Sequence, residues 1–427
     1  MDKRKIGRRV APIECYINTG SKLATLDAKS SLHVLPGQTA PGDPGPAAAP
    51  ATYGQYLGSI VRYLCKNSHR ALRNLLKRQA EKPAARSCPG QGLPTFGGGG
   101  KSDSPSAPPL HSLENARRPP ALESASKIEL ISEKHGAFYS VSRLRLHFAD
   151  EMRSFAVNCA VSPWQQAFLR VESKLVAKLH SKFALPHIPT PFLRAKTPME
   201  GDRAGADLML SISEWFEGYH EFHLSSNASG APKIRVWDPP RPGFPDEATA
   251  SLFYEEASSI LTSYLDTGSF AQIYPWHHAA GDFVVDPLQN PPNLKLITVR
   301  GYRSLLAAKS RNDKMLGTLH FFVNLGIRMR IDRLDGTGDL AWAGSQALPG
   351  VIRGFARAWE ARQNGKEDLP NACEIFSLFL NLAPEERVAF AEAVAQDGRV
   401  EADEADFLQA RLPRHVIELS NALTNVL

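Results

Sequence analysis

The segment with the clearest chemical potential is Trp276 to Val285, which reads Trp-His-His-Ala-Ala-Gly-Asp-Phe-Val-Val. A Gly-Asp pair is expected to form a turn here, and a short apolar strand is expected to follow it. A carboxylate presented in this way can act as a general base, so Asp282 is the expected catalytic residue. His278 can hydrogen-bond the loop backbone or transfer a proton. The alternative interpretation is that Asp282 only caps its own turn.

Histidines form a second constellation. Residues 217–223 read Glu-Gly-Tyr-His-Glu-Phe-His, which places His220 and His223 close together in the chain. With His277 and His278 they have the side chains needed for a metal site of a hydrolase. The spacing is not the His-Glu-x-x-His of zinc proteases. Surface or partly buried histidines with a structural role are the alternative.

Composition separates the first 126 residues from the rest. They hold 14 of the 32 prolines, and they carry 18 Lys/Arg against 8 Asp/Glu, whereas the remaining residues carry 32 against 36. Such a segment buries too little apolar area to offset chain entropy, so residues 1–125 are expected to be a disordered basic arm. A compact, protease-resistant core is then expected to begin near Ser126. The arm suits an acidic partner, nucleic acid or an anionic membrane, or serves only to keep the protein in solution.

One helix is predicted inside the arm, at residues 53–79. Its apolar residues have helical spacing, and six Lys/Arg side chains occupy the other face. Such a helix lies on an anionic membrane or in a partner groove, or it docks on its own domain.

Cysteine usage and hydropathy bear on location. The five cysteines are widely spaced without a Cys-x-x-Cys motif, which favours a reducing compartment. The sequence contains no run of eighteen apolar residues, so no membrane span is predicted. The basic first residues are not followed by an apolar segment of the length found in signal peptides. A cytoplasmic protein is expected.

From Ser126 onwards the pattern predicts an α+β fold. We expect strands at 127–132, 137–148 and 154–161, and then a helix capped by Ser162-Pro163 that runs to about Phe183. Strands near 191–195 and 206–216 follow. Residues 226–247 are expected to be loop, 248–265 helix, 294–299 strand, and most of the remainder helix.

This order of elements resembles the protein-kinase-like fold of the aminoglycoside and choline phosphotransferase type, over about residues 127–345. Ala280-Gly281-Asp282 corresponds to the His-Gly-Asp of the catalytic loop, and the strand at 294–300 to the one that carries a metal-binding aspartate. The resemblance implies a small antiparallel-sheet lobe at 126–216 and a mainly helical lobe at 217–368. A helical module at 369–427 and the arm at 1–125, with its helix at 53–79, complete the expected organisation.

Departures from the family pattern bear on activity. Asn158 stands where the resemblance implies a lysine, and Thr298 where it implies a second aspartate. Pro287 replaces the amide that follows the catalytic aspartate, whereas Glu172 matches the glutamate of the helix. Phosphoryl transfer depends on positioning and charge neutralisation, so ATP and Mg²⁺ are possible ligands but are not expected to bind strongly. Arg143 and Arg145, on one face of a strand, are candidates to replace the lysine.

Two further segments carry dense charge. Residues 328–336 read Arg-Met-Arg-Ile-Asp-Arg-Leu-Asp-Gly and are predicted to form a solvated helix end, with lining of the cleft as the alternative. Residues 397–404 match the second half of a calcium-binding loop, but alanines occupy its first ligand positions, so a turn between helices is expected.

The sequence thus predicts a degenerate, pseudokinase-like binding or scaffolding protein with a protein or small-molecule partner. Two alternatives stay open. One is a phosphotransferase that acts on a small molecule with unusual metal ligands, and the other is a His-dependent metal hydrolase.

Overall fold

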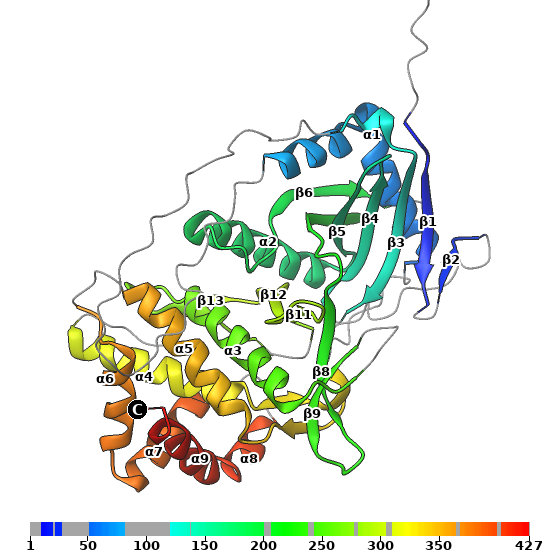
Figure 1. The fold of residues 1–427 in the computed structure, drawn as a ribbon. Helices are drawn as coiled ribbons and strands as arrows, with labels where there is room; N and C mark the ends of the chain where they lie inside the picture. The colour runs from blue at the N-terminus through cyan, green and yellow to red at the C-terminus, as the bar shows by residue number, and fades with distance from the viewer. Residues whose placement is uncertain are drawn as a thin grey trace, which may run out of the picture. The chain divides into compact units, whose positions relative to one another are not determined.

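The fold is mixed α and β and divides into two compact units (Figure 1). A computed structural model describes residues 10–19, 22–27, 51–81, 120–136, 138–199, 206–237, 243–276, 281–304, 310–363, 368–398 and 403–426. The first unit takes its described residues from Met1–Ala85, Pro94–His180 and Pro189–Glu217. The second takes them from Ser181–Ile188 and Gly218–Leu427.

The first unit is built on a seven-stranded sheet with the order β2-β1-β3-β4-β5-β7-β6 (Figure 1). Strands β1 and β3 pair in parallel, and all other neighbours in this sheet are antiparallel. The strands are β1 (Ile13–Asn18), β2 (Leu23–Thr25), β3 (Lys127–His135), β4 (Ser140–His147), β5 (Met152–Ala160), β6 (Pro191–Pro198) and β7 (Asp207–Glu214).

Helix α1 (Tyr53–Ala80) contributes to the core of the first unit. Thr52 and Gln55 form a reciprocal cap at its start, and its helical geometry is interrupted at Lys66–His69. Its apolar face, which includes Leu57 and Leu72, is buried with strand residues such as Leu144. The interpretation in which this helix docks on its own domain is therefore confirmed, and its apolar face is not available to a membrane or a partner groove.

The arm contains more structure than the sequence predicted. Strand β1 lies beside β3, with Ile13 opposite Ile128, and β2 extends the sheet by a further strand. Partly buried residues of β1, such as Ile13 and Cys15, pack against the same core as α1. The sequence predicted that 53–79 is the one ordered part of the arm, and strands β1 and β2 show that this prediction is wrong. The predicted start of the compact core near Ser126 is also wrong, because α1 and β1 contribute to that core. The rest of the predicted arm, apart from the short turn of helix at Leu122–Ser124, lies largely outside the described residues.

Helix α2 (Pro163–Phe183) packs near the opposite face of the sheet. Alternate residues of a strand point to opposite faces of the sheet. The residues next to Ala160 and Met209 in the chain belong to the core shared with α1, so Ala160 and Met209 point to the other face. Leu169 of α2 belongs to the same hydrophobic cluster as these two residues. The backbone N–H groups of Ser162 and Gln165 each donate to the other's side chain, at 3.3 and 3.4 Å, so the predicted cap is confirmed.

The second unit combines a four-stranded sheet, of order β12-β11-β8-β9, with most of the helices. Strand β9 lies inside the stretch 226–247, which the sequence predicted as loop, so that prediction is wrong there. The strands are β8 (His220–Ser226), β9 (Pro232–Val236), β10 (Ala271–Ile273), β11 (Phe283–Asp286), β12 (Asn293–Leu296), β13 (Tyr302–Ser304), β14 (Ile331–Arg333) and β15 (Leu340–Trp342). The helices are α3 (Glu247–Ser263), α4 (Arg311–Arg328), α5 (Ala347–Gln363), α6 (Ala372–Asn381), α7 (Pro384–Asp397), α8 (Glu404–Gln409) and α9 (Leu412–Thr424).

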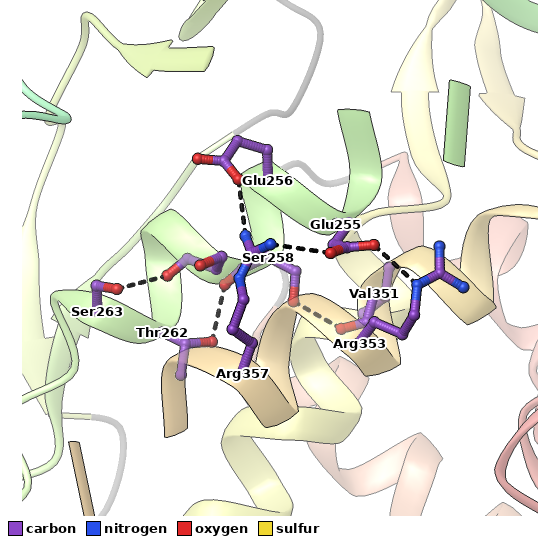
Figure 2. Close-up of polar contacts among 9 residues, drawn as sticks. Glu255, Glu256, Ser258, Thr262, Ser263, Val351, Arg353 and Arg357 are labelled. Carbon is purple, nitrogen blue, oxygen red and sulfur yellow. Dashed lines mark hydrogen bonds and ion pairs between the residues drawn. The ribbon is translucent and has the colours of Figure 1, made fainter. Parts of the chain in front are cut away.

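Helices α3 and α5 approach each other closely in the second unit. A Cβ atom built on Gly354 would lie 2.0 Å from the Glu255 carbonyl oxygen, so only a residue without a side chain fits there. Figure 2 shows the polar contacts along this pair, in which Arg353 and Arg357 both bond Glu255, at 2.8 and 2.9 Å. The Ser258 hydroxyl donates to the Val351 carbonyl at 2.8 Å. Within the described residues, no helix has the length and apolar character needed to cross a membrane.

Candidate functional site

Asp282 occupies the position immediately before strand β11. Gly281 precedes it with a φ of +79°, a backbone conformation that favours glycine. The Asp282 backbone carbonyl accepts a hydrogen bond from the Ile297 N–H at 2.7 Å, which joins it to the chain just after β12. The side chain is buried, with 1% of its surface exposed. The turn-and-strand setting expected for Asp282 is therefore present, but its carboxylate is largely shielded from solvent.

Arg300 neutralises this carboxylate. Its Nη2 donates to Asp282 Oδ1 at 2.8 Å, and the arginine side chain is itself only 17% exposed. Thr298, at the position where the sequence resemblance implied a second aspartate, is half-buried, and the neighbouring Ile297 and Arg300 both contact Asp282. A general base must reach a substrate proton, and an ion-paired buried carboxylate is poorly placed for that role.

A second carboxylate that the sequence did not single out lies near this pair. Asp332 of β14 is 1% exposed, and the Leu224 N–H of β8 approaches its Oδ2 at 3.5 Å. The pKa of Asp332 is raised to about 7, chiefly by burial and to a smaller extent by the charge of Asp282. Hydrogen bonds from backbone N–H groups and the influence of His223 act in the opposite direction. Two buried carboxylates, Asp282 and Asp332, therefore influence each other in this part of the second unit.

The histidines of β8 have structural surroundings. His223 is buried, its ring meets the Trp237 ring edge-on with centroids 5.7 Å apart, and its Nε2 lies 3.7 Å from the Glu221 carboxylate. A Cβ on Gly336 would lie 2.7 Å from the same ring. His220 is half-buried opposite Val285 of β11. These contacts agree with the interpretation as partly buried structural histidines.

Two members of the predicted metal set remain. His277, and His278, which was also the predicted proton carrier, lie outside the described residues. In the ranges that the structure describes, no group of three or more His, Cys, Asp or Glu side chains is arranged to hold a metal ion.

Four predicted site residues belong to the first unit. Asn158 of β5 is half-buried and pairs in register with Val141 and Ser211. Glu172 is buried on α2. Arg143 and Arg145 do share one face of β4, as predicted, because the leucines between and beside them point into the core.

Arg143 is already engaged within its own unit. Its Nε lies 2.6 Å from Glu133 Oε1, its Nη1 lies 3.6 Å from Glu217 Oε2, and its guanidinium stacks at 4.9 Å over the Trp215 ring. Burial and the charge of Arg143 lower the pKa of the neighbouring Arg145. The predicted substitute for the missing lysine therefore has acidic partners of its own.

The charged side chains of 328–332 are buried, which contradicts the prediction of a solvated helix end for that part of 328–336. Arg333 is half-buried and Asp335 is exposed. Arg328, at the end of α4, bonds Glu404 at 2.8 Å, and both side chains are at most 2% exposed. Arg330 bonds Glu418 at 2.6 Å. Their carboxylates come from α8 and α9, far along the sequence, so no local pattern revealed them. The stretch 397–404 supplies Glu404 and also Asp403, which pairs with Arg333 at 2.8 Å.

Comparison with known proteins does not identify the chain, since neither a protein-family model nor a curated protein matches it. Two residues of the candidate site were missed by sequence reasoning, namely Arg300 and Asp332. Both lie in segments that the sequence analysis considered, but their closeness to Asp282 depends on tertiary structure.

Proposed function

We propose that the protein is a non-catalytic binding or scaffolding protein with a degenerate, two-lobed phosphotransferase-like architecture. The observation that carries the proposal is the buried ion pair between Asp282, the expected general base, and the guanidinium of Arg300. The uncharged Asn158 and Thr298, at positions where phosphotransferases of this type carry charge, give further support.

The pair has a structural purpose in this proposal. A buried carboxylate without a partner is unfavourable, and Arg300 supplies the compensating charge at the point where the chain leaves β12. Catalytic carboxylates, in contrast, are held in environments that reduce stability for the sake of activity, and their replacement often leaves stability unchanged or improved. The sign of the stability change on replacing Asp282 therefore distinguishes the two roles.

The first arm of the test is Asp282→Asn in urea denaturation. We expect a loss of about 1–3 kcal/mol, because Arg300 is left without its counter-charge. Arg300→Gln and the double variant complete a double-mutant cycle, in which a favourable coupling between the two residues is expected. The control is Asp286→Asn, at the end of the same strand, whose carboxylate bonds the turn residues Leu288 and Gln289.

The second arm is a thermal-shift titration of the wild type with ATP and Mg²⁺. We expect no magnesium-dependent shift, whereas a ligand at a hundred times its Kd would stabilise by about 2.7 kcal/mol. A magnesium-dependent shift at micromolar ATP that disappears in Asp282→Asn, together with unchanged or increased stability of that variant, would contradict the proposal. That result would favour a phosphotransferase with unusual metal ligands.

A further inference from the structure

A pocket of about 680 Å³ lies in the second unit, where the connection from β15 to α5 meets the start of α9. Arg330, Trp342 and residues 343–346 form one part of its lining, and Arg411, Arg414 and Glu418 form another. None of the residues around Asp282 lines it. Small-molecule sites in proteins commonly enclose about 300–1,000 Å³, so this pocket has the size of an organic ligand rather than of a single ion.

The described lining has an excess of positive charge. Its three guanidinium groups face one carboxylate, Glu418, which bonds Arg330 at 2.6 Å and Arg414 at 2.8 Å. The adjacent His415 adds no charge at neutral pH, since burial, and then the charge of Arg330, lower its pKa to about 3. The lining that the structure describes therefore carries a net charge of +2.

Arg411 is the cation with the least compensation. Its guanidinium stacks at 3.6 Å over the Phe407 ring, and its Nη1 donates to the Phe407 carbonyl at 2.9 Å. Among the described residues the structure gives it no carboxylate partner. Its charge is thus available to a ligand in the pocket.

Arg330 is held rigidly. It is 3% exposed, its Nε donates to the Ala343 carbonyl at 2.8 Å, and its guanidinium lies 4.7 Å from the centre of the half-buried Trp342 ring. A guanidinium fixed in this way loses little freedom on binding, and Arg forms paired hydrogen bonds with phosphate oxygens. Helix α5 begins directly after Gln346, and the partial positive charge of its first turn adds to the same potential.

We propose that this pocket binds a phosphate monoester of a small molecule. A phosphate monoester carries a charge of about −1.5 to −2 at pH 7, which balances the lining. The rest of the pocket has room for the organic group, and Trp342 provides it with an aromatic surface. This site is independent of the role proposed for Asp282.

Calorimetry on the full chain with simple probes tests the charge requirement. Phenyl phosphate is expected to bind, and phenyl sulfate, of similar shape but with one charge, to bind at least about tenfold more weakly. Inorganic phosphate is also expected to bind at least about tenfold more weakly, because it leaves Trp342 uncovered. Equal affinity for the sulfate ester would overturn the requirement for a dianion, and equal affinity for inorganic phosphate would overturn the enclosure of an organic group.

Variants locate the binding. Arg411→Gln and Arg414→Gln are each expected to weaken phenyl phosphate binding about tenfold or more, as the loss of a charge-assisted hydrogen bond does. The Arg414 side chain is 86% exposed, so its replacement leaves folding intact. Arg311→Gln is the matched control, since Arg311 is an exposed arginine that is paired with Glu374, away from the pocket lining, and it should bind as the wild type does.

Glu418→Gln is expected to change the affinity for phenyl phosphate in the opposite direction from the arginine variants. Removing the one carboxylate of the described lining should tighten phenyl phosphate binding severalfold, because the lining then carries a higher positive charge and Arg414 no longer has a carboxylate partner. The change also lowers the melting temperature in the absence of ligand, since Arg330 loses a partner, and a larger ligand-induced shift is therefore expected. Unchanged binding in both arginine variants, or weaker binding in Glu418→Gln, would overturn the assignment of this site.

Discussion

The outer face of α1 and the segment Arg328–Arg333 are both rich in arginine, yet they have opposite environments. Helix α1 carries six Lys/Arg and no Asp/Glu, and residues such as Lys66 and Arg70 on it are exposed. In the other segment Arg328 and Arg330 are almost completely buried. Composition alone therefore does not decide whether a charged side chain meets solvent.

The two regions differ in exposure because of where their apolar residues and their oppositely charged partners lie. The apolar residues of α1 recur with helical spacing and bury one face, so charged side chains such as Lys66 and Arg70 lie on the other face and remain exposed to solvent. The buried charges of Arg328 and Arg330 are compensated in the interior by Glu404 and Glu418, which lie 76 and 88 residues further along the chain. Burial of a charge is tolerated where such a carboxylate is fixed opposite it.

The largest expected effect tests this contrast directly. Glu404→Gln removes the counter-charge of Arg328 in the core and should reduce stability by about 3–5 kcal/mol, measured by urea denaturation. Replacing both partners, as Arg328→Met with Glu404→Leu, should restore most of the loss. In α1, the combined Lys66→Gln and Arg70→Gln change should alter stability by no more than about 0.5 kcal/mol. Similar losses in the two regions would refute the distinction.

The helix pair α3–α5 shows whether close packing or the number of ion pairs matters more. Gly354→Ala should cost about 1–3 kcal/mol, because the new methyl group meets the Glu255 carbonyl, and this cost is net of the better helix propensity of alanine. Arg357→Gln removes two ion pairs at the same interface but should cost less than about 1 kcal/mol, since the arginine side chain is 41% exposed. Equal losses of the two variants in denaturation experiments would show that the ion pairs dominate.

Asp332, a buried carboxylate in the segment Arg328–Arg333, makes the stability of the folded protein depend on pH. Its pKa is about 7 in the folded protein, above the ordinary value of 3.8, so the folded state binds this proton more tightly than the unfolded state. Stability from this group is therefore fully present below about pH 4 and is lost as the pH rises through 7. His223, Asp282 and Tyr254 are the titratable groups that interact with it.

Asp332→Asn should accordingly stabilise the protein at pH 8 relative to the wild type, by about 1–3 kcal/mol at most, and have little effect at pH 4. The measurement is denaturation at both pH values. A variant that is destabilised at pH 8 would show that the ionised carboxylate has favourable partners.

Local features of the fold were predictable, whereas contacts between distant segments were not. Helix α2 could be predicted because its cap at Ser162, its first proline and its apolar stripe lie within one short stretch. The turn at Asp282 was recognised for the same reason. The pairing of Asp282 with Arg300 and its closeness to Asp332 depend on how β11, β12 and β14 assemble. Strand β1 was missed because it is short and surrounded by residues of disordered-like composition.

The parallel pairing of β1 with β3 also has a consequence for how the first unit folds. Strands β3, β4 and β5 follow one another closely and form antiparallel neighbours, whereas Ile13 and Ile128 must meet across 115 residues of chain. Closing so long a loop carries a large entropic cost, and such contacts form slowly. Strand β1 should therefore dock late onto a preformed hairpin array, and it should be the first part of the sheet to detach, and to exchange its amide hydrogens, under native conditions.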